Sequence, residues 1–263
     1  TGSVAELNTM YTQAGLVNRG TQALTLTDTS VTAVALSTFD ARTTGTINAS
    51  SVTTLTGTAA DVATNYASTG ISGLGNEAVT LSDTSLTATT LNSIDTRTSG
   101  TINASTVTTL TGTAADVASS YTSTGITGLG NEAVTLSGTT ATAAELNAIN
   151  VATTGTVGIT SVLTVTGALA DLTTMYGATG FSGRGDEAIT LTDTSAAVSI
   201  LNSLDTNTTG TINASTVTLL TGSAADVATS YVSSGITGLG SAVVILSGTT
   251  ATAAALNAID AAT

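Results

Sequence analysis

A tandem repeat with a period of 55 constrains this chain more than any other feature of its sequence. The segment TGTAADVA at 56–63 returns at 111–118, and close variants stand at 166–173 and 221–228, without insertion or deletion. Self-similarity at a fixed period is typical of architectures in which each copy packs on the next. We therefore expect one continuous solenoid over 1–263. Its copies span 1–55, 56–110, 111–165, 166–220 and a partial 221–263.

Each copy contains two similar halves. Residues 100–124 read GTINASTVTTLTGTAADVASSYTST, and residues 125–154 follow the same order of an extended stretch, a Thr/Val/Leu segment and a short polar-capped segment. Val and Thr are enriched in strands. A half of about 27 residues lies within the coil length of known solenoids. The sequence predicts an α/β solenoid of stacked strand–strand–short helix coils.

The short helices carry start signals. Thr142 followed by Glu145 predicts a capping box, in which each side chain binds the other residue's backbone N–H. A second helix start recurs elsewhere in each copy, with Ser or Thr at Ser3, Thr58, Thr113 and Ser223; in the fourth copy Ala168 stands there and predicts a missing cap. A helix of about two turns is not stable alone in water. These helices must therefore be held by neighbouring coils.

Two spacings predict how the coils stack. Paired strands lie about 4.8 Å apart, whereas packed helices need about 8–10 Å. Helices placed in one straight row, one in every layer, would collide. A curved stack would relieve the collision, and so would helices of alternate halves on opposite sides. We favour alternating sides, because that arrangement explains why the true period is 55 rather than half of it.

Composition excludes several classes of function. The chain has a net charge of −13, four Arg, and no Lys, His or Cys. Nucleic-acid binding needs clustered cations, and an acidic chain is repelled by anionic membranes. No run of apolar residues is long enough to span a bilayer. Without His, Cys or Lys the usual bases and nucleophiles are missing, so we expect no enzyme.

Two series of residues recur at fixed phases and predict structural ladders. We expect the tyrosines to lie buried at helical core spacing, and the asparagines that follow a helical Leu to form a stacked amide ladder. The tyrosines are Tyr11, Tyr66, Tyr121, Tyr176 and Tyr231, and the asparagines are Asn92, Asn147, Asn202 and Asn257.

Acidic residues also recur in register. Asp28, Asp83 and Asp193 share one phase and are the candidate metal ligands, because Ca²⁺ prefers carboxylate and carbonyl oxygens. Gly138 and Gly248 replace this Asp in two copies. The competing interpretation, which we favour, is a solvated acidic edge that also includes two further series. These are Glu77, Glu132 and Glu187, and Asp40, Asp95, Asp205 and Asp260.

One short motif resembles known proteins. TAAELNAI at 142–149 resembles a motif of phage tail-fibre repeats and of long repetitive bacterial surface proteins, and it recurs less well at 252–260, where Ala255 replaces Glu. The acidic, Thr-rich, Cys-free chain also resembles giant extracellular repeat proteins of marine bacteria, including cyanobacteria. The resemblance implies an exposed structural or adhesive role and carries over no functional residue.

These observations together predict a structural segment of an extracellular filament, sheath or surface-layer protein. Its partners would be copies of itself, end to end or laterally. Three alternatives stay open. An adhesin or tail-fibre segment that binds cell-surface glycan would need exposed aromatic rings. A calcium-dependent surface repeat would need the aspartates described above. An ice-binding solenoid would need threonines in register on one flat face.

Overall fold

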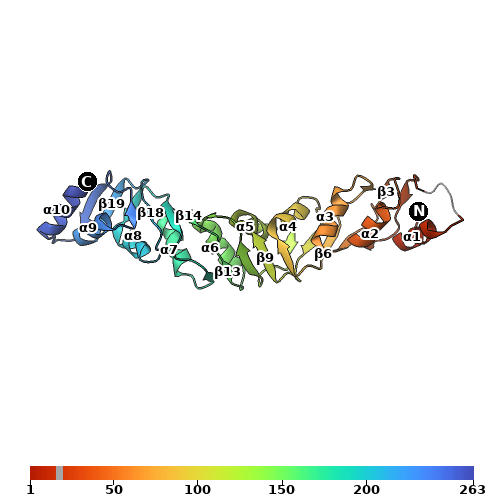
Figure 1. Ribbon diagram of the computed structural model, residues 1–263, viewed down its shortest axis with the longest axis horizontal. Helices are drawn as coiled ribbons and strands as arrows, with labels where there is room; N and C mark the ends of the chain where they lie inside the picture. The colour runs from red at the N-terminus through yellow and green to blue at the C-terminus, as the bar shows by residue number, and fades with distance from the viewer. Residues whose placement is uncertain (16–19) are drawn as a thin grey trace. The chain divides into compact units, whose positions relative to one another are not determined.

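The computed structural model describes residues 1–15 and 20–263 (Figure 1). These residues fold as two units. Unit 1 comprises Thr1–Gly112 and Ser119–Glu132, and unit 2 comprises Thr113–Ala118 and Ala133–Thr263. Helix α5 (Ala114–Thr122) contributes residues to both units. In each unit the strands and helices follow one another in chain order.

Unit 1 repeats short strands and helices of eight or nine residues. Its helices are α1 (Val4–Thr12), α2 (Ala33–Asp40), α3 (Ala59–Ala67) and α4 (Ala88–Asp95). Its strands are β1 (Leu24–Thr25), β2 (Ser30–Thr32), β3 (Ile47–Asn48), β4 (Thr54–Gly57), β5 (Ile71–Ser72), β6 (Ala78–Leu81), β7 (Ser85–Thr87), β8 (Ile102–Asn103), β9 (Thr109–Gly112) and β10 (Ile126–Thr127).

Unit 2 has the same order of elements. Its helices are α6 (Ala143–Ala152), α7 (Leu169–Gly177), α8 (Val198–Asp205), α9 (Ala224–Val232) and α10 (Ala253–Ala262). Its strands are β11 (Ala133–Leu136), β12 (Thr140–Thr142), β13 (Val157–Gly158), β14 (Thr164–Gly167), β15 (Phe181–Ser182), β16 (Ala188–Leu191), β17 (Ser195–Ala197), β18 (Ile212–Asn213), β19 (Leu219–Ser223), β20 (Ile236–Thr237) and β21 (Val243–Ser247).

All of the paired strands run parallel. In unit 1 the sheets are β1-β3-β5 and β2-β4-β6-β8-β10, and β7 pairs with β9. In unit 2 they are β11-β13-β15, β12-β14-β16-β18-β20 and β17-β19-β21. Each strand pairs with a strand of the next coil along the chain, as Ser30 pairs with Thr54. The repeated strand–strand–helix order and the parallel sheets agree with the predicted α/β solenoid class.

The core lies between the inner face of the strands and the helices. Helix α4 buries Ala88, Leu91 and Ile94, spaced by three residues, and β6 buries Val79 and Leu81, spaced by two. Those two periods are the ones expected of an amphipathic helix and a half-buried strand. None of the described helices is long and apolar enough to cross a membrane.

The capping predictions are confirmed. Thr142 Oγ1 accepts from Glu145 N at 3.1 Å, and Glu145 Oε2 accepts from Thr142 N at 2.9 Å. The fourth copy has no side-chain cap at Ala168, as expected. An Asp at the Glu position forms only half of the box: the Thr58 hydroxyl accepts from Asp61 N and donates to the Asp61 carboxylate.

The prediction that helices of successive halves lie on opposite sides is wrong. In unit 1, α3 packs against both α2 and α4, and in unit 2, α7 packs against both α6 and α8. The side-chain amide of Asn65 in α3 donates to the carbonyl oxygen of Ala33 in α2 at 2.9 Å. Successive helices therefore lie side by side.

A difference between two spacings makes this arrangement possible. Helices α2, α3 and α4 begin at Ala33, Ala59 and Ala88. Successive partners in the sheet stand closer together in the chain, as Thr56 pairs with Thr80 and Thr80 pairs with Asn103. Each helix is therefore displaced along its coil relative to the helix before it. Displaced helices have the room that directly superposed helices would lack.

Candidate functional site

The candidate metal ligands lie at the starts of helices from the preceding coil. Asp83 Oδ2 accepts from Ala59 N, the first residue of α3, at 2.7 Å. Asp28 accepts in the same way from Val4 N at 2.8 Å, and Asp193 from Leu169 N at 2.7 Å. The first N–H groups of a helix lack intrahelical partners, and the helix dipole favours a negative charge there. These aspartates therefore cap helices across neighbouring coils.

The structure does not bring these aspartates together. Within residues 1–15 and 20–263, no three acidic side chains gather into a group that could hold a metal ion. The capping bonds account for the recurrence of the series without a metal. Calcium binding at Asp28, Asp83 and Asp193 stays a prediction.

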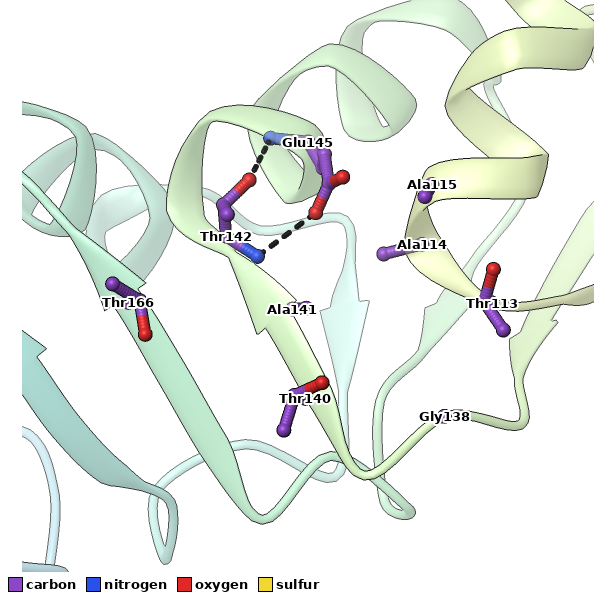
Figure 2. A pocket seen from close by; sticks show the side chains of 9 residues that line it. All are labelled: Thr113, Ala114, Ala115, Gly138, Thr140, Ala141, Thr142, Glu145 and Thr166. Carbon is purple, nitrogen blue, oxygen red and sulfur yellow. Dashed lines mark hydrogen bonds between the residues drawn. The ribbon is translucent and has the colours of Figure 1, made fainter.

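A groove lies where this aspartate is missing. Gly138 stands at the Asp position, and the groove beside it measures about 470 Å³ (Figure 2). Thr113, Ala114 and Ala115 line it at the start of α5, and Thr142 and Glu145 line it at the start of α6. A similar groove, lined by Ser223, Ala224 and Thr252 among others, occurs in the copy that has Gly248. The grooves mark helix starts that lack the carboxylate of a following coil.

We expect Gly138→Asp to stabilise the protein by about 1 kcal/mol, because it restores a helix cap. A Cβ atom at Gly138 would meet its nearest neighbours at 3.6 Å and 3.8 Å, which is ordinary contact. Gly248→Asp is the matched control: Gly248 has φ +90°, so strain offsets the gain. Urea denaturation measures both variants, and a Gly138→Asp variant no more stable than the parent would contradict the capping role.

The expectation of a solvated acidic edge is wrong for the glutamate series. Glu77, Glu132 and Glu187 are each 0% exposed. Gly75, at φ +131°, turns the chain so that Gly75 N and Asn76 N donate to Glu77 Oε2 at 2.8 Å and 3.1 Å. The Tyr66 hydroxyl donates to Glu77 Oε1. Such charge-assisted hydrogen bonds allow a carboxylate to be buried.

The same Tyr–Glu pair recurs in the third and fourth copies. Tyr121 donates to Glu132, and Tyr176 donates to Glu187 Oε2 at 2.8 Å. Burial, together with the bond to Glu, raises the pKa of the Tyr66 and Tyr176 hydroxyls well above their ordinary value. Tyr66 and Tyr176 therefore stay protonated at neutral pH and donate to their glutamates.

The tyrosines differ in their burial and in their contacts. Tyr176 is buried at 8% exposure, and the other four are half-buried. Three hydroxyls bind glutamates, and Tyr231 donates to Leu239 O at 3.4 Å. Tyr11 packs edge-on against Phe39, with the ring centroids 5.5 Å apart. The Tyr11 hydroxyl is buried without a hydrogen-bond partner. A glycan site needs exposed aromatic faces, and these partly covered rings are poorly suited to one.

Three of the asparagines bind the next helix. Asn147 Nδ2 donates to Asp171 O at 2.9 Å, and Asn202 Nδ2 donates to Asp226 O at 3.0 Å. Asn92 Oδ1 accepts from Ser120 at 2.7 Å. Asn257, in α10, is exposed. The expectation that these amides satisfy backbone groups is confirmed for Asn147 and Asn202, and their stacking into a ladder stays a prediction.

Two further sets of contacts between coils escaped the sequence analysis. The first joins a serine to an aspartate: the Ser68 hydroxyl donates to Asp40 Oδ2 at 2.7 Å, and Ser123 makes the same bond to Asp95. Where the third copy meets the fourth, Asn150 and Ala178 stand at the equivalent positions and change together. That paired change was the signal that could have revealed the contact.

In the second set, threonine hydroxyls join coils through main-chain carbonyl groups. Thr53 Oγ1 donates to Thr29 O of the preceding coil at 3.0 Å, and Thr108 does the same to Thr84. Thr98 Oγ1 donates to Glu77 O at 2.8 Å. A hydroxyl that replaces water at such a carbonyl adds a bond between coils. This use gives the Thr-rich composition a structural reason.

In-register threonines form one column in a sheet of unit 1. Thr32, Thr56 and Thr80 are successive partners, and the column continues through Asn103. The neighbouring outward column runs from Ser30 and Thr54 to Ala78. The hydroxyl array that ice binding would require is thus two residues wide at β2 and β4 and narrows to one at β6.

No protein-family model, no curated protein and no solved structure matches this chain.

Proposed function

We propose that the chain is a structural segment of an extracellular filament, sheath or surface layer, and that its residues form one continuous solenoid with a true period of 55. The sequence keeps this spacing through every copy without insertion or deletion. Both units contain the same order of strands and helices. Linkers between independent domains tolerate insertions, so unbroken spacing favours one continuous stack.

One observation carries the proposal of a mechanical role. The acidic side chains that offered candidates for chemistry bind neighbouring coils instead: Asp83 caps the helix at Ala59, and Asp40 accepts from Ser68. Threonine hydroxyls such as Thr53 add bonds in the same direction along the chain. In a repeat protein, stability comes from such contacts between neighbours. Polar groups used in this way favour a scaffold over an active site.

In the proposed scaffold, separate molecules of this protein join end to end. Parallel strands at the edge of a sheet present unpaired main-chain groups, which can pair with a strand of another molecule. The extracellular location rests on the resemblance of TAAELNAI at 142–149 and on the acidic, Cys-free composition.

Sedimentation equilibrium at several protein concentrations tests this function. An end-to-end scaffold makes an open-ended series, so we expect the weight-average mass to rise above 25.4 kDa and to keep rising with concentration. The same runs with a calcium chelator separate this behaviour from a calcium-dependent assembly. A particle that stays monomeric over the whole range would contradict the proposal.

A further inference from the structure

An apolar patch lies on the outward face of two neighbouring strands of unit 2. Val243 and Ile245 in β21 are 65% and 56% exposed, and Leu219 in β19 is the direct partner of Val243 in the ladder. The same strands bury Leu220 on their inner face. We call Leu219, Val243 and Ile245 the β19–β21 patch.

The patch is absent from the equivalent positions of the other copies. Where β21 has Val243, the others have Ala, and where it has Ile245, they have Thr. Leu219 stands where three earlier copies have Thr. The equivalent residues are Ala23, Ala78, Ala133 and Ala188; Thr25, Thr80, Thr135 and Thr190; and Thr54, Thr109 and Thr164. Three apolar replacements at one place make a patch that the repeat itself does not require.

A further coil would not cover these side chains. Strand β6 has a partner on each side, β4 and β8, and its outward residue Thr80 is still exposed, whereas Val79 on its inner face is buried. Pairing along the sheet thus hides the inward positions fully, whereas outward ones stay exposed, as at Thr80, or half-buried, as at Ala78 and Thr190. Val243 and Ile245 occupy outward positions, so a contact from the side is needed to cover them.

The charges around the patch indicate which partner fits. From Val227 to Ile259 the chain has no charged residue, although its net charge is −13. Ala242, Gly248 and Ala255 each stand where at least one other copy has an acidic residue. Two copies of an acidic chain repel each other over most of their surface. They can approach where both are neutral and apolar, whereas a cationic partner would be drawn to the acidic remainder.

We propose that the β19–β21 patch is a lateral contact between two copies of this chain. The outward faces of β19 and β21 pack against the same faces of a second copy, as two sheets do at about 10 Å. The contact is isologous, because each copy offers the same surface. This inference rests on the proposed scaffold function and names the surface by which its strands associate sideways.

Reverting the patch to the residues of the other copies tests the proposal. The variant Leu219→Thr/Val243→Ala/Ile245→Thr keeps residues that this fold already accepts at equivalent positions. We expect its lateral dissociation constant to rise at least about tenfold. The control is Val151→Thr, which removes an apolar side chain that is 87% exposed in α6. Sedimentation velocity measures both, and equal association of the reverted variant and the parent would overturn the proposal.

Cysteine cross-linking separates the lateral contact from end-to-end continuation. The chain has no Cys, so Ile245→Cys introduces a single thiol. With oxidised glutathione, we expect a disulfide-linked dimer from Ile245→Cys and none from Val151→Cys. A mass that rises without limit, but with no cross-link at 245, overturns the lateral contact and leaves the scaffold. A cross-link with a mass that stops at the dimer supports the contact and overturns end-to-end growth.

Discussion

Gly210→Ala should destabilise the protein by about 3 kcal/mol, whereas Gly177→Ala should stabilise it slightly. A Cβ atom at Gly210 would overlap the carbonyl group of Glu187 and approach Ala188 N, which are backbone atoms of the preceding coil and cannot move aside. The cost arises because the backbones of neighbouring coils approach each other closely at this turn. Gly45 and Gly100, at the equivalent positions, face the same kind of overlap with a preceding coil.

The control tests whether tight contact between coils, rather than loss of a glycine, is responsible. A Cβ atom at Gly177 would meet nothing within 4 Å, and Ala67 holds the equivalent position. Gly177 ends α7, where Ala costs less conformational entropy. Urea denaturation followed by circular dichroism compares the two variants. Equal stability of the two would rule out close approach of the coils at Gly210.

Glu77→Gln should cost about 2–4 kcal/mol of unfolding free energy, because the amide cannot replace the carboxylate in its buried turn. Glu77 accepts from Gly75 N, Asn76 N and the Tyr66 hydroxyl. An NH₂ group in place of one oxygen would face these donors and leave at least one of them without a partner. Thermal and urea unfolding measure the loss.

A surface glutamate supplies the matched control for this substitution. Glu145→Gln changes the same group in the capping box of α6, where the side chain is partly exposed, and should cost about 1 kcal/mol or less. A double-mutant cycle of Glu77→Gln with Tyr66→Phe should give a coupling energy of about 1–3 kcal/mol. If Glu77→Gln costs no more than Glu145→Gln, the buried pair contributes little to the fold.

Local features of the fold could be predicted from the sequence because they depend on neighbouring residues. The capping box of Thr142 and Glu145 and the missing cap at Ala168 each involve a few consecutive positions. The burial of Leu91 and Ile94 follows from helical spacing in the same way. Such patterns can be recognised without knowing how the coils stack.

Contacts that depend on how one coil lies on the next could not be predicted in this way. The recurrence of Asp83 shows its period, but its bond to Ala59 N depends on the step between coils in the strand ladder, which the repeat period does not reveal. Glu77 looked solvent-exposed because acidic residues usually are. Its burial depends on the turn at Gly75, which directs two N–H groups to its own carboxylate.

The unequal steps of helices and strands also limit how a neighbour can touch this protein. Within each unit, successive strand partners are separated by fewer residues than successive helix starts are. Equivalent side chains therefore shift around the coils from layer to layer and do not stack in a straight line. A straight neighbour alongside one unit meets a different part of the repeat at every layer. An apolar contact patch on such a surface is therefore not repeated in line along the unit. Isolated patches favour association of molecules in pairs over growth into broad sheets.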